Sequence, residues 1–363
     1  MAFFTKVDIP AADFKIDYTS RLAFFGSCFA DNISALFAER KFHVLANPFG
    51  TVYNPVSLAM QIKAIADGKV FGEEDVFQDT RCDGLWHCWD AHSSLSGATK
   101  EECIKKLNAA TTQAREFLQK ASVIFTTLGS AFVYYLKDSG KPVSNCHRQD
   151  PNLFTRRIIS VDEAPEAIRG IATSIRQLNQ NVHIVFTVSP IRHLGDGAHG
   201  NNLSKAPVLL GIERAIEEIA ASPSAPRNDN ASRASAGVYS RICETQQSCA
   251  SRNDTVDYFP SYEIVMDELR DYRFYADDMI HLSKTAEDYI FERMVDTYCS
   301  EKTRADIACV EKFMKMANHR IVGSDANKIR AFAEQQLARA TELEKQIPGL
   351  DLTQEKENCK KFC

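Results

Sequence analysis

The fold is decided by the stretch Arg21-Leu-Ala-Phe-Phe-Gly-Ser-Cys-Phe-Ala-Asp-Asn-Ile-Ser-Ala-Leu-Phe-Ala-Glu-Arg-Lys-Phe-His-Val-Leu-Ala46. Residues 21–25 form a short apolar run that ends at a glycine, which predicts a strand. Residues 31–40 then carry apolar side chains at helical spacing, and residues 42–46 predict a second strand. A strand, a helix and a strand in this order are typical of a right-handed crossover between parallel strands.

The same pattern recurs twice further along the chain. A helical stripe over residues 104–117 leads into a strand over residues 122–128, and a stripe over residues 168–178 leads into a strand over residues 182–188. This alternation predicts a three-layer α/β/α sandwich of the flavodoxin-like type with a central parallel sheet. Such sheets bind ligands beyond the carboxyl ends of their strands, so the chemistry is expected after four residues: Phe25, Ala46, Leu128 and Val188.

The composition is that of an ordinary globular protein, with 363 residues, 44% of them hydrophobic and 25% charged, and a net charge of -5. Mild acidity without a basic stripe argues against a nucleic-acid partner or an anionic membrane. No apolar run approaches the ~20 residues of a membrane helix, and charges interrupt the first ten residues, so no signal peptide is predicted. The 11 cysteines lack a regular framework, which predicts reduced thiols in a cytoplasmic protein.

The chain is expected to contain a main domain over residues 1–300 and a helical extension over residues 301–363. Residues 221–253 are rich in Ser, Ala, Arg and Asn, a composition that predicts a flexible insertion. Residues 300–345 are charged and favour helix, with a break at residues 322–325. This pattern predicts a pair of solvated helices packed on the main domain.

Two nucleophilic side chains lie at the predicted turn between the first strand and the first helix. Ser27 and Cys28 follow Gly26 directly, where exposed amides and the helix dipole favour developing negative charge. A thiol at this position is also expected to have a lowered pKa. The alternative is a structural role, in which Ser27 caps the helix and Cys28 is buried as a small apolar residue.

A carboxylate and a histidine lie three residues apart near the end of the main domain, in the segment Asp278-Met-Ile-His281. At this spacing the carboxylate can hydrogen-bond the imidazole, which fixes its tautomer and leaves the other nitrogen free as a base. Asp-x-x-His also arises often by chance, and then it only caps or solvates a turn.

Together, the two elements resemble the layout of SGNH/GDSL hydrolases. More closely, Gly26-Ser-Cys-Phe-Ala30 resembles the motif that names the GSCFA-domain family, a branch of that superfamily. The resemblance runs from about residue 20 to about residue 300. Six further segments are similar to the same family: Asn47-Pro-Phe-Gly-Thr-Val-Tyr-Asn-Pro55, Leu85-Trp-His-Cys-Trp-Asp90, Thr127-Leu-Gly-Ser130, Asn145-Cys-His147, Thr187-Val-Ser-Pro190 and Tyr258-Phe-Pro-Ser-Tyr-Glu263.

The resemblance implies a metal-independent acyl esterase that needs no cofactor and acts on a small-molecule or glycan ester. Cys28 or Ser27 would attack the acyl carbonyl, His281 would act first as base and then as acid, and Asp278 would orient it. Laid on the Gly-Asp-Ser motif of the superfamily, the register places Cys28 at the nucleophile position. Helix-end activation also favours Cys28, whereas hydrolytic precedent in the superfamily favours Ser27.

Backbone amides of the nucleophile and of Gly50 are expected to stabilise the oxyanion. The asparagine that superfamily relatives carry in the turn after the third strand is missing from residues 129–131. Asn54 and Asn145 are the candidates to replace it, and His147 is expected to line the substrate site with them.

Two other functions stay open at this point. A thioester on Cys28 can be intercepted by an acceptor other than water, which would make the protein an acyltransferase or a thioesterase. The chain could also be a binding module that keeps the fold without catalysis.

Two further patterns are discounted. Gly195-Asp-Gly-Ala-His-Gly200 matches G-x-G-x-x-G, but it does not abut the preceding strand as a dinucleotide site requires. The ligand-type residues near Trp86 and Trp89, and those in the later loop, lack a CxxC or HExxH pattern, so we expect aromatic packing and polar loops there and no metal. They are His87, Cys88, Asp90, His92, His193, Asp196 and His199.

Overall fold

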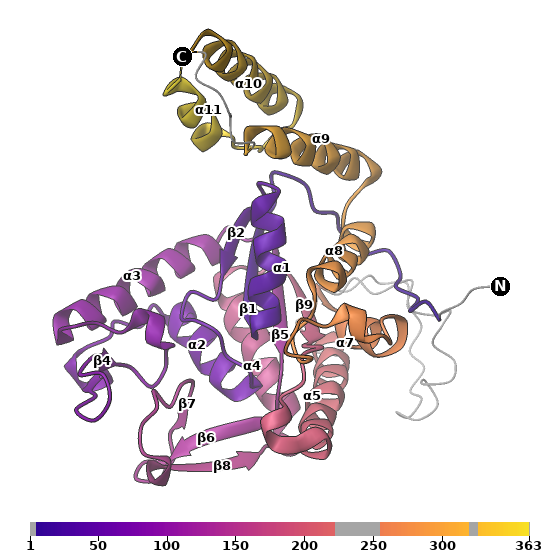
Figure 1. Ribbon diagram of the computed structural model, residues 1–363. Coiled ribbons are helices and arrows are strands. Elements are labelled where there is room, and N and C mark those ends of the chain that lie inside the picture. Colours follow the sequence, from indigo (N-terminus) through magenta and orange to yellow (C-terminus); the bar gives the residue numbers. More distant parts are fainter. Residues whose placement is uncertain (1–4, 222–254, 319–325, 363) are drawn as a thin grey trace.

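The computed structural model describes residues 5–221, 255–318 and 326–362 (Figure 1). Apart from its first residue, the insertion predicted over residues 221–253 lies outside the described residues, as does the predicted break at residues 322–325. No helix in the described part of the chain is long and apolar enough to cross a membrane.

The central sheet has five parallel strands in the order β10-β9-β5-β1-β2. If the five strands are renumbered along the chain and read from the β2 edge, this order is 2-1-3-4-5. It is a doubly wound arrangement in which the strand order reverses beside the first strand. The predicted three-layer α/β fold and the parallel pairing of its four predicted strands are therefore confirmed. The strands are β1 (Arg21–Gly26), β2 (His43–Ala46), β5 (Val123–Leu128), β9 (His183–Val188) and β10 (Val256–Tyr258).

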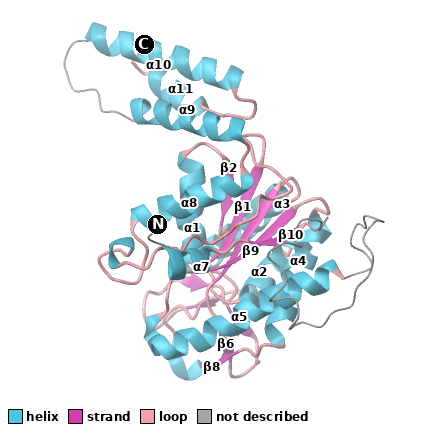
Figure 2. Ribbon diagram, turned by 90° about the vertical axis from the view of Figure 1, so that its right-hand side faces the viewer, coloured by secondary structure: helices cyan, strands magenta, loops and turns pink. Residues whose placement is uncertain are grey.

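Each face of this sheet is covered by helices (Figure 2). Successive side chains of a strand point to opposite faces, so Ala23 and Phe25 join the core on one face, while Leu22 and Phe24 join the core on the other. Burial on both faces explains why the predicted strands are continuous apolar runs. The first face carries α2 (Pro55–Asp67), α3 (Lys100–Leu118), α4 (Glu163–Leu178) and α5 (Gly197–Ala220), and the second carries α1 (Cys28–Glu39) and α8 (Lys284–Tyr298).

Two small antiparallel sheets, absent from the sequence prediction, accompany the central one. The three-stranded sheet β7-β6-β8 follows β5 and extends from the carboxyl edge of the central sheet (Figure 1). Short turns of helix complete the loops. These elements are β3 (Phe77–Gln78), β4 (Trp86–His87), β6 (Phe132–Leu136), β7 (Pro142–Val143), β8 (Phe154–Ile158), α7 (Ser261–Glu263) and a π-turn over Ile264–Glu268, with 3-10 turns at Glu73–Asp75, Ser93–Leu95, Pro151–Leu153, Leu194–Asp196 and Tyr272–Phe274.

The carboxyl-terminal helices pack against the edge at which the strands begin. They are α9 (Glu301–Ala317), α10 (Ala326–Gln346) and α11 (Thr353–Lys360). Val310 and Phe313 of α9 are fully buried in the same core as the second face of the sheet, and the Arg40 guanidinium pairs with Glu311 at 2.6 Å. This region therefore lies at the end of the sheet opposite the carboxyl edge (Figure 1).

Gly26 ends β1 where no other residue fits. Its φ is +116°, and a Cβ built on it would lie 1.9 Å from the carbonyl oxygen of Thr127. The same carbonyl accepts a hydrogen bond from the Ser27 N–H at 3.1 Å. The glycine therefore allows β1 and β5 to stay paired up to the point where the chain turns into α1.

We expect Gly26→Ala to lower the free energy of unfolding by roughly 3 kcal/mol or more, because backbone strain and a backbone clash act together. Gly140→Ala is the matched control, since Gly140 also has a positive φ (+67°) but has no neighbour within 4 Å of its Cβ position. The control should lose only about 1 kcal/mol. Urea unfolding followed by circular dichroism measures both, and equal losses would contradict the role given to the Thr127 contact.

Candidate active site

Ser27 occupies the N-cap position of α1, but its hydroxyl does not cap the helix. The side chain is fully buried, and Oγ has no hydrogen-bond partner among the described residues. A buried hydroxyl without a partner costs about 1–3 kcal/mol. The capping role that would explain this serine structurally is therefore wrong.

Cys28 is the first residue of α1, and its side chain is half-buried. Burial raises the pKa of its thiol, and the carboxylate of Asp31 raises it further, which outweighs the opposing effect of the backbone amides at the start of the helix. The expected lowering of this pKa by the helix end is thus wrong, because that expectation neglected burial and Asp31. Near neutral pH, Cys28 is a thiol that needs a base to become a nucleophile.

Asp31 ties the loop after β2 to the turn after β1. Its two carboxylate oxygens accept hydrogen bonds from Asn47 Nδ2 at 2.7 Å and from Thr51 Oγ1 at 3.0 Å. Asn47 Oδ1 in turn accepts the Gly26 N–H at 2.8 Å. Sequence reasoning missed this role, although the segment that begins at Asn47 was among those similar to the family.

The expected hydrogen bond between Asp278 and His281 is present, with Asp278 Oδ2 2.6 Å from Nδ1 of the imidazole. Asp278 Oδ1 accepts the backbone N–H groups of Ile280 and His281, each at 2.9 Å. These three hydrogen bonds, led by the one to the His281 side chain, lower the pKa of Asp278 to about 2. Asp278 is therefore ionised at neutral pH and holds the imidazole through Nδ1, and no described residue hydrogen-bonds its Nε2.

The loop that carries His281 lies at the same edge as the first turn. It leads into α8, where Glu287 accepts a hydrogen bond from Asn32 Nδ2 of α1 at 2.5 Å. About half of the His281 side chain is exposed. Among the described residues, no hydrogen bond joins this imidazole to Ser27 or Cys28, so the expected separation of about 3–4 Å stays a prediction.

The residues expected to stabilise an oxyanion differ in whether they have a hydrogen-bond donor without a partner in the described part of the chain. The Gly50 N–H, one of the expected donors, instead closes a turn by donating to the Asn47 carbonyl at 2.7 Å. Asn54 Oδ1 caps α2 by accepting the Ser57 N–H at 2.8 Å, while its Nδ2 has no hydrogen bond to any described residue. Of these two, Asn54 is the one with a donor to offer.

Asn145 and His147 belong to a cluster of polar and aromatic side chains. Asn145 Oδ1 accepts the His147 N–H at 2.8 Å, and both nitrogens of the buried His147 ring are engaged, with Ser93 Oγ at 3.0 Å and the Cys88 carbonyl at 2.8 Å. Burial lowers the pKa of His147 to about 4. Its ring stacks on His87 at 4.4 Å, so the geometry favours a structural role for His147.

The predicted aromatic packing around Trp89 is confirmed in the same cluster, where Phe77 stacks on Trp89 at 3.8 Å between ring centroids. Ligand-type atoms of Asp79, Asp83 and His87 lie within 4.8 Å of one another. However, the Asp79 carboxylate accepts the N–H groups of the loop that follows it, and the His87 imidazole contacts Asp83 and Ser96. These side chains are used to hold the loop.

At the carboxyl edge, sequence reasoning missed Lys205 and discounted His193 as a polar loop residue. Lys205 of α5 is 1% exposed, and its Nζ donates to the Ser189 carbonyl at 2.5 Å. Burial lowers its pKa to about 7. His193 packs its ring against Tyr53 at 4.8 Å, and its Nε2 is buried without a described partner. The available signal for Lys205 was its position among Asn201, Val208 and Ile212, a lysine on the buried face of an amphipathic helix.

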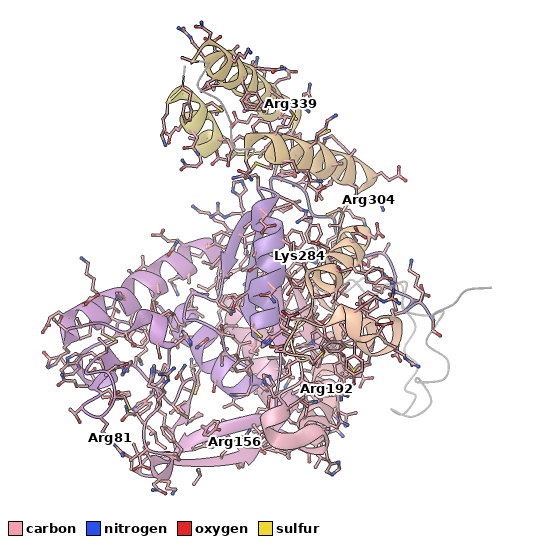
Figure 3. All side chains as sticks on the ribbon, viewed as in Figure 1. Arg81, Arg156, Arg192, Lys284, Arg304 and Arg339 are labelled. Atoms are coloured by element: carbon pink, nitrogen blue, oxygen red, sulfur yellow. The ribbon has the colours of Figure 1, made fainter. Side chains whose placement is uncertain are left out.

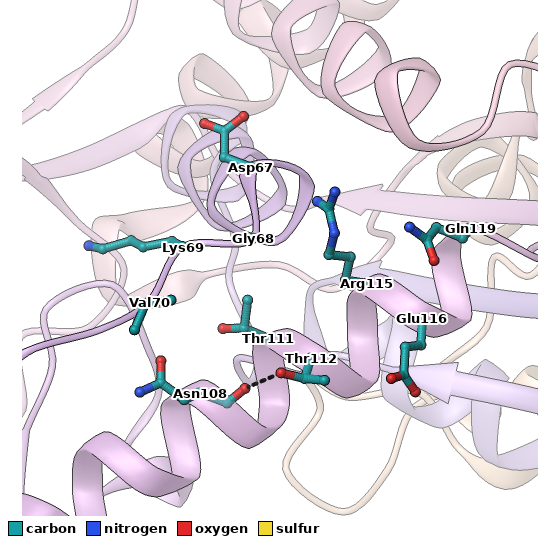
Figure 4. Close-up of a pocket in the computed structure, with 10 residues that line it drawn as sticks. All are labelled: Asp67, Gly68, Lys69, Val70, Asn108, Thr111, Thr112, Arg115, Glu116 and Gln119. Atoms are coloured by element: carbon teal, nitrogen blue, oxygen red, sulfur yellow. Dashed lines mark hydrogen bonds between the residues drawn. The ribbon is translucent and has the colours of Figure 1, made fainter.

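A separate groove lies between the carboxyl-terminal parts of α2 and α3 (Figure 4). Its two cations already serve the structure: Arg115 Nη1 donates to the Ile65 carbonyl at 3.2 Å and to the Ala66 carbonyl, and Lys69 pairs with Asp75 at 2.6 Å. The sequence-predicted site residues do not line this groove.

The raised pKa of Cys28 can be tested by alkylation. The rate at which iodoacetamide modifies Cys28 should rise with pH, with a midpoint above the ordinary thiol range, because only the thiolate reacts. Asp31→Asn should lower that midpoint by removing a negative charge. Thr51→Val, which removes a hydrogen bond to the same carboxylate without changing its charge, is the control. Mass spectrometry of the Cys28 peptide gives the rates, and an unchanged midpoint in Asp31→Asn would contradict the assignment.

The comparisons with known proteins agree with the family resemblance. The GSCFA family model matches residues 21–223 and 232–294. The model described as GSCFA domain protein, C-terminal domain, matches residues 310–362. Among curated proteins and solved structures, none matches the chain. The family model covers more than half of the sequence, and the chain therefore belongs to the GSCFA family.

Proposed function

We propose that this protein cleaves acyl esters by the SGNH type of mechanism, with a nucleophile in the β1–α1 turn and His281 as its base. The observation that carries the proposal is the 2.6 Å hydrogen bond between Asp278 and His281 Nδ1, which leaves Nε2 free at the edge where β1 ends. A carboxylate that orients a histidine is the arrangement that general-base catalysis requires. Acyl groups on sugars or small molecules are the proposed substrates.

Accessibility favours Cys28 over Ser27 as the nucleophile. The Cys28 side chain is partly exposed, whereas Ser27 is fully buried. An attacking atom must come within about 3.5 Å of the carbonyl carbon, which the Ser27 hydroxyl cannot do without a rearrangement of the turn. The raised pKa of the thiol fits a cysteine that is activated only when a base removes its proton.

The reaction then proceeds through a thioester. His281 Nε2 accepts the thiol proton, and the sulfur attacks the acyl carbon, so that the carbonyl oxygen becomes an oxyanion. The Cys28 N–H, which has no acceptor within the helix, and Asn54 Nδ2 are the donors we assign to it. The C–O bond breaks as His281 returns the proton to the leaving alcohol. Water, deprotonated by the same imidazole, releases the acid and restores the thiol.

Transfer of the acyl group to another acceptor is the second candidate function. It is favoured by the partial burial of Cys28, because a shielded thioester is less open to bulk water and more open to a bound alcohol or amine. Analysis of the products with and without an acceptor alcohol separates transfer from hydrolysis.

Four variants test the mechanism with 4-nitrophenyl acetate as substrate. His281→Ala should lower kcat/KM by at least ~1,000-fold because the base and acid roles are lost together, and Asp278→Asn should lower it by as much or less. Cys28→Ser should lose most activity, while Ser27→Ala should stay active. His43→Gln is the control, because His43 lies at the opposite end of the sheet, where it contacts the Gly349 carbonyl.

The activities of these variants answer two questions: which residue is the nucleophile, and whether the protein is a catalyst at all. A dead Ser27→Ala together with a nearly normal Cys28→Ser would assign the attack to Ser27. Full activity in His281→Ala would end the proposal for either nucleophile. Mapping the residue labelled by a fluorophosphonate probe and by a thiol-directed probe gives an independent assignment.

A further inference from the structure

Two cations at the carboxyl edge, Arg192 and Lys205, form no ion pair with any residue in the described ranges. We propose that they form a binding site for an oxyanion, a carboxylate or a phosphate group, carried by the substrate. This inference rests on the proposed function in one respect: the molecule that carries the oxyanion is taken to be an acyl ester.

Lys205 is the buried member of the pair. Its Nζ makes one hydrogen bond, to the Ser189 carbonyl at 2.5 Å, and lies 5.8 Å from the centroid of the Tyr262 ring. An ammonium has three protons to donate, so two remain for a ligand. An ammonium held in the interior without a counter-ion is costly, and a bound anion would remove that cost.

Arg192 lies in the loop after β9, beside α5 and α7 in Figure 3. Nη2 of its guanidinium contacts the Met266 sulfur at 3.9 Å. Its Nε is buried and has no hydrogen-bond partner in the described part of the chain. A guanidinium with a free planar edge is the group best suited to bind a carboxylate or phosphate with two hydrogen bonds.

Further donors around the two cations are also unused. Asn201 Oδ1 accepts the His193 N–H at 3.0 Å, but Asn201 Nδ2 is buried without a described partner, and so is the Ser189 hydroxyl. Asn201 and Lys205 are four residues apart on α5, so they share a face of the helix. Ser189 and Asn201 are at most 2% exposed, and the site therefore presents buried neutral donors beside its charges.

The carboxylates near these two cations already interact with other residues. The positive charge of Arg192 and Lys205 is therefore open to a ligand. Asp196, the acid closest in sequence to Arg192, pairs with Arg156 through two contacts at 2.6 and 2.7 Å. On the other side, Asp267 pairs with Arg270 at 2.7 Å. Glu268 pairs with Arg293 at 2.6 Å. Glu263 accepts the Tyr258 hydroxyl at 2.9 Å.

The site lies on the edge that carries the nucleophile. The Ser189 N–H donates to the Leu128 carbonyl at 2.8 Å, and β5 separates β9 from β1 in the sheet. Strands are about 4.8 Å apart, so the ends of β9 and β1 are roughly 10 Å apart. The Cys28 and Lys205 side chains narrow this gap, since each shifts the pKa of the other, so an ester with an oxyanion a few bonds from its carbonyl, such as a succinyl ester, is long enough to contact both.

Binding is tested first without any reaction. Calorimetry at constant ionic strength should show that the protein binds succinate or inorganic phosphate, and the tighter of the two identifies the oxyanion. Arg192→Gln and Lys205→Met should each weaken that binding at least tenfold, whereas Arg304→Gln, on α9, should not change it. Circular dichroism verifies that the variants fold. Binding that is absent, or equal in all four proteins, would overturn the proposal.

The pH dependence gives a second readout on the same proteins. The pKa of Lys205 is lowered to about 7 by burial and by Arg192, against the opposing effect of Cys28. The pKa of His193 is lowered to about 4, and that of the Cys28 thiol is raised, while the Tyr262 ring faces the ammonium. Lys205 therefore loses its charge as the pH rises through 7, and anion affinity should fall up to tenfold per unit above it. A flat profile between pH 6 and 9 would contradict the role of Lys205.

Activity separates this inference from the proposed function. The ratio of kcat/KM for 4-nitrophenyl hemisuccinate to that for 4-nitrophenyl pentanoate should exceed tenfold in the natural protein and should fall at least tenfold in Arg192→Gln. If neither ester is cleaved but succinate still binds through Arg192, the proposed function fails and the anion site stands. If pentanoate is cleaved through His281 but the ratio is near one in both proteins, the anion site fails and the esterase stands.

Discussion

The contact between Gly26 and the Thr127 carbonyl is the constraint on which the site depends. It keeps β1 paired with β5 to the last residue before α1, and it places Ser27 and Cys28 where the strand order of the sheet reverses. Helices leave from opposite faces at such a point, so a crevice opens between the loops. The Asp31–Asn47 hydrogen bond then fixes the neighbouring loop to the same turn.

Burial shifts the pKa values of two titratable groups near this turn in opposite directions. It disfavours the thiolate of Cys28 and the ammonium of Lys205, so both groups tend toward their neutral forms. Burial therefore reduces the charge that these two groups carry at neutral pH. In the proposed mechanism, charge develops at this turn when a substrate arrives, either on the oxyanion or on the imidazole, and a low-dielectric surrounding makes each hydrogen bond to that charge stronger.

The sequence predicts some of these features well, for identifiable reasons. Buried parallel strands are continuous apolar runs, so the sheet could be predicted, and a spacing of three residues allowed the Asp278–His281 hydrogen bond to be anticipated. The direction of the Cys28 pKa shift could not be predicted, because it depends on burial and on how the side chain of Asp31 is held. Lys205 was missed because lysines on helices ordinarily point to solvent.

The order of the site along the chain has a consequence for biosynthesis. The proposed nucleophile is encoded before residue 30, but the edge strand β10 and the proposed base, His281, are both encoded after residue 255. A nascent chain folds from its amino terminus as it is made, so for most of its synthesis it carries a thiol without a base. In the proposed mechanism such a thiol reacts slowly with acyl donors, so the growing polypeptide would be protected from acylating itself before β10 is in place.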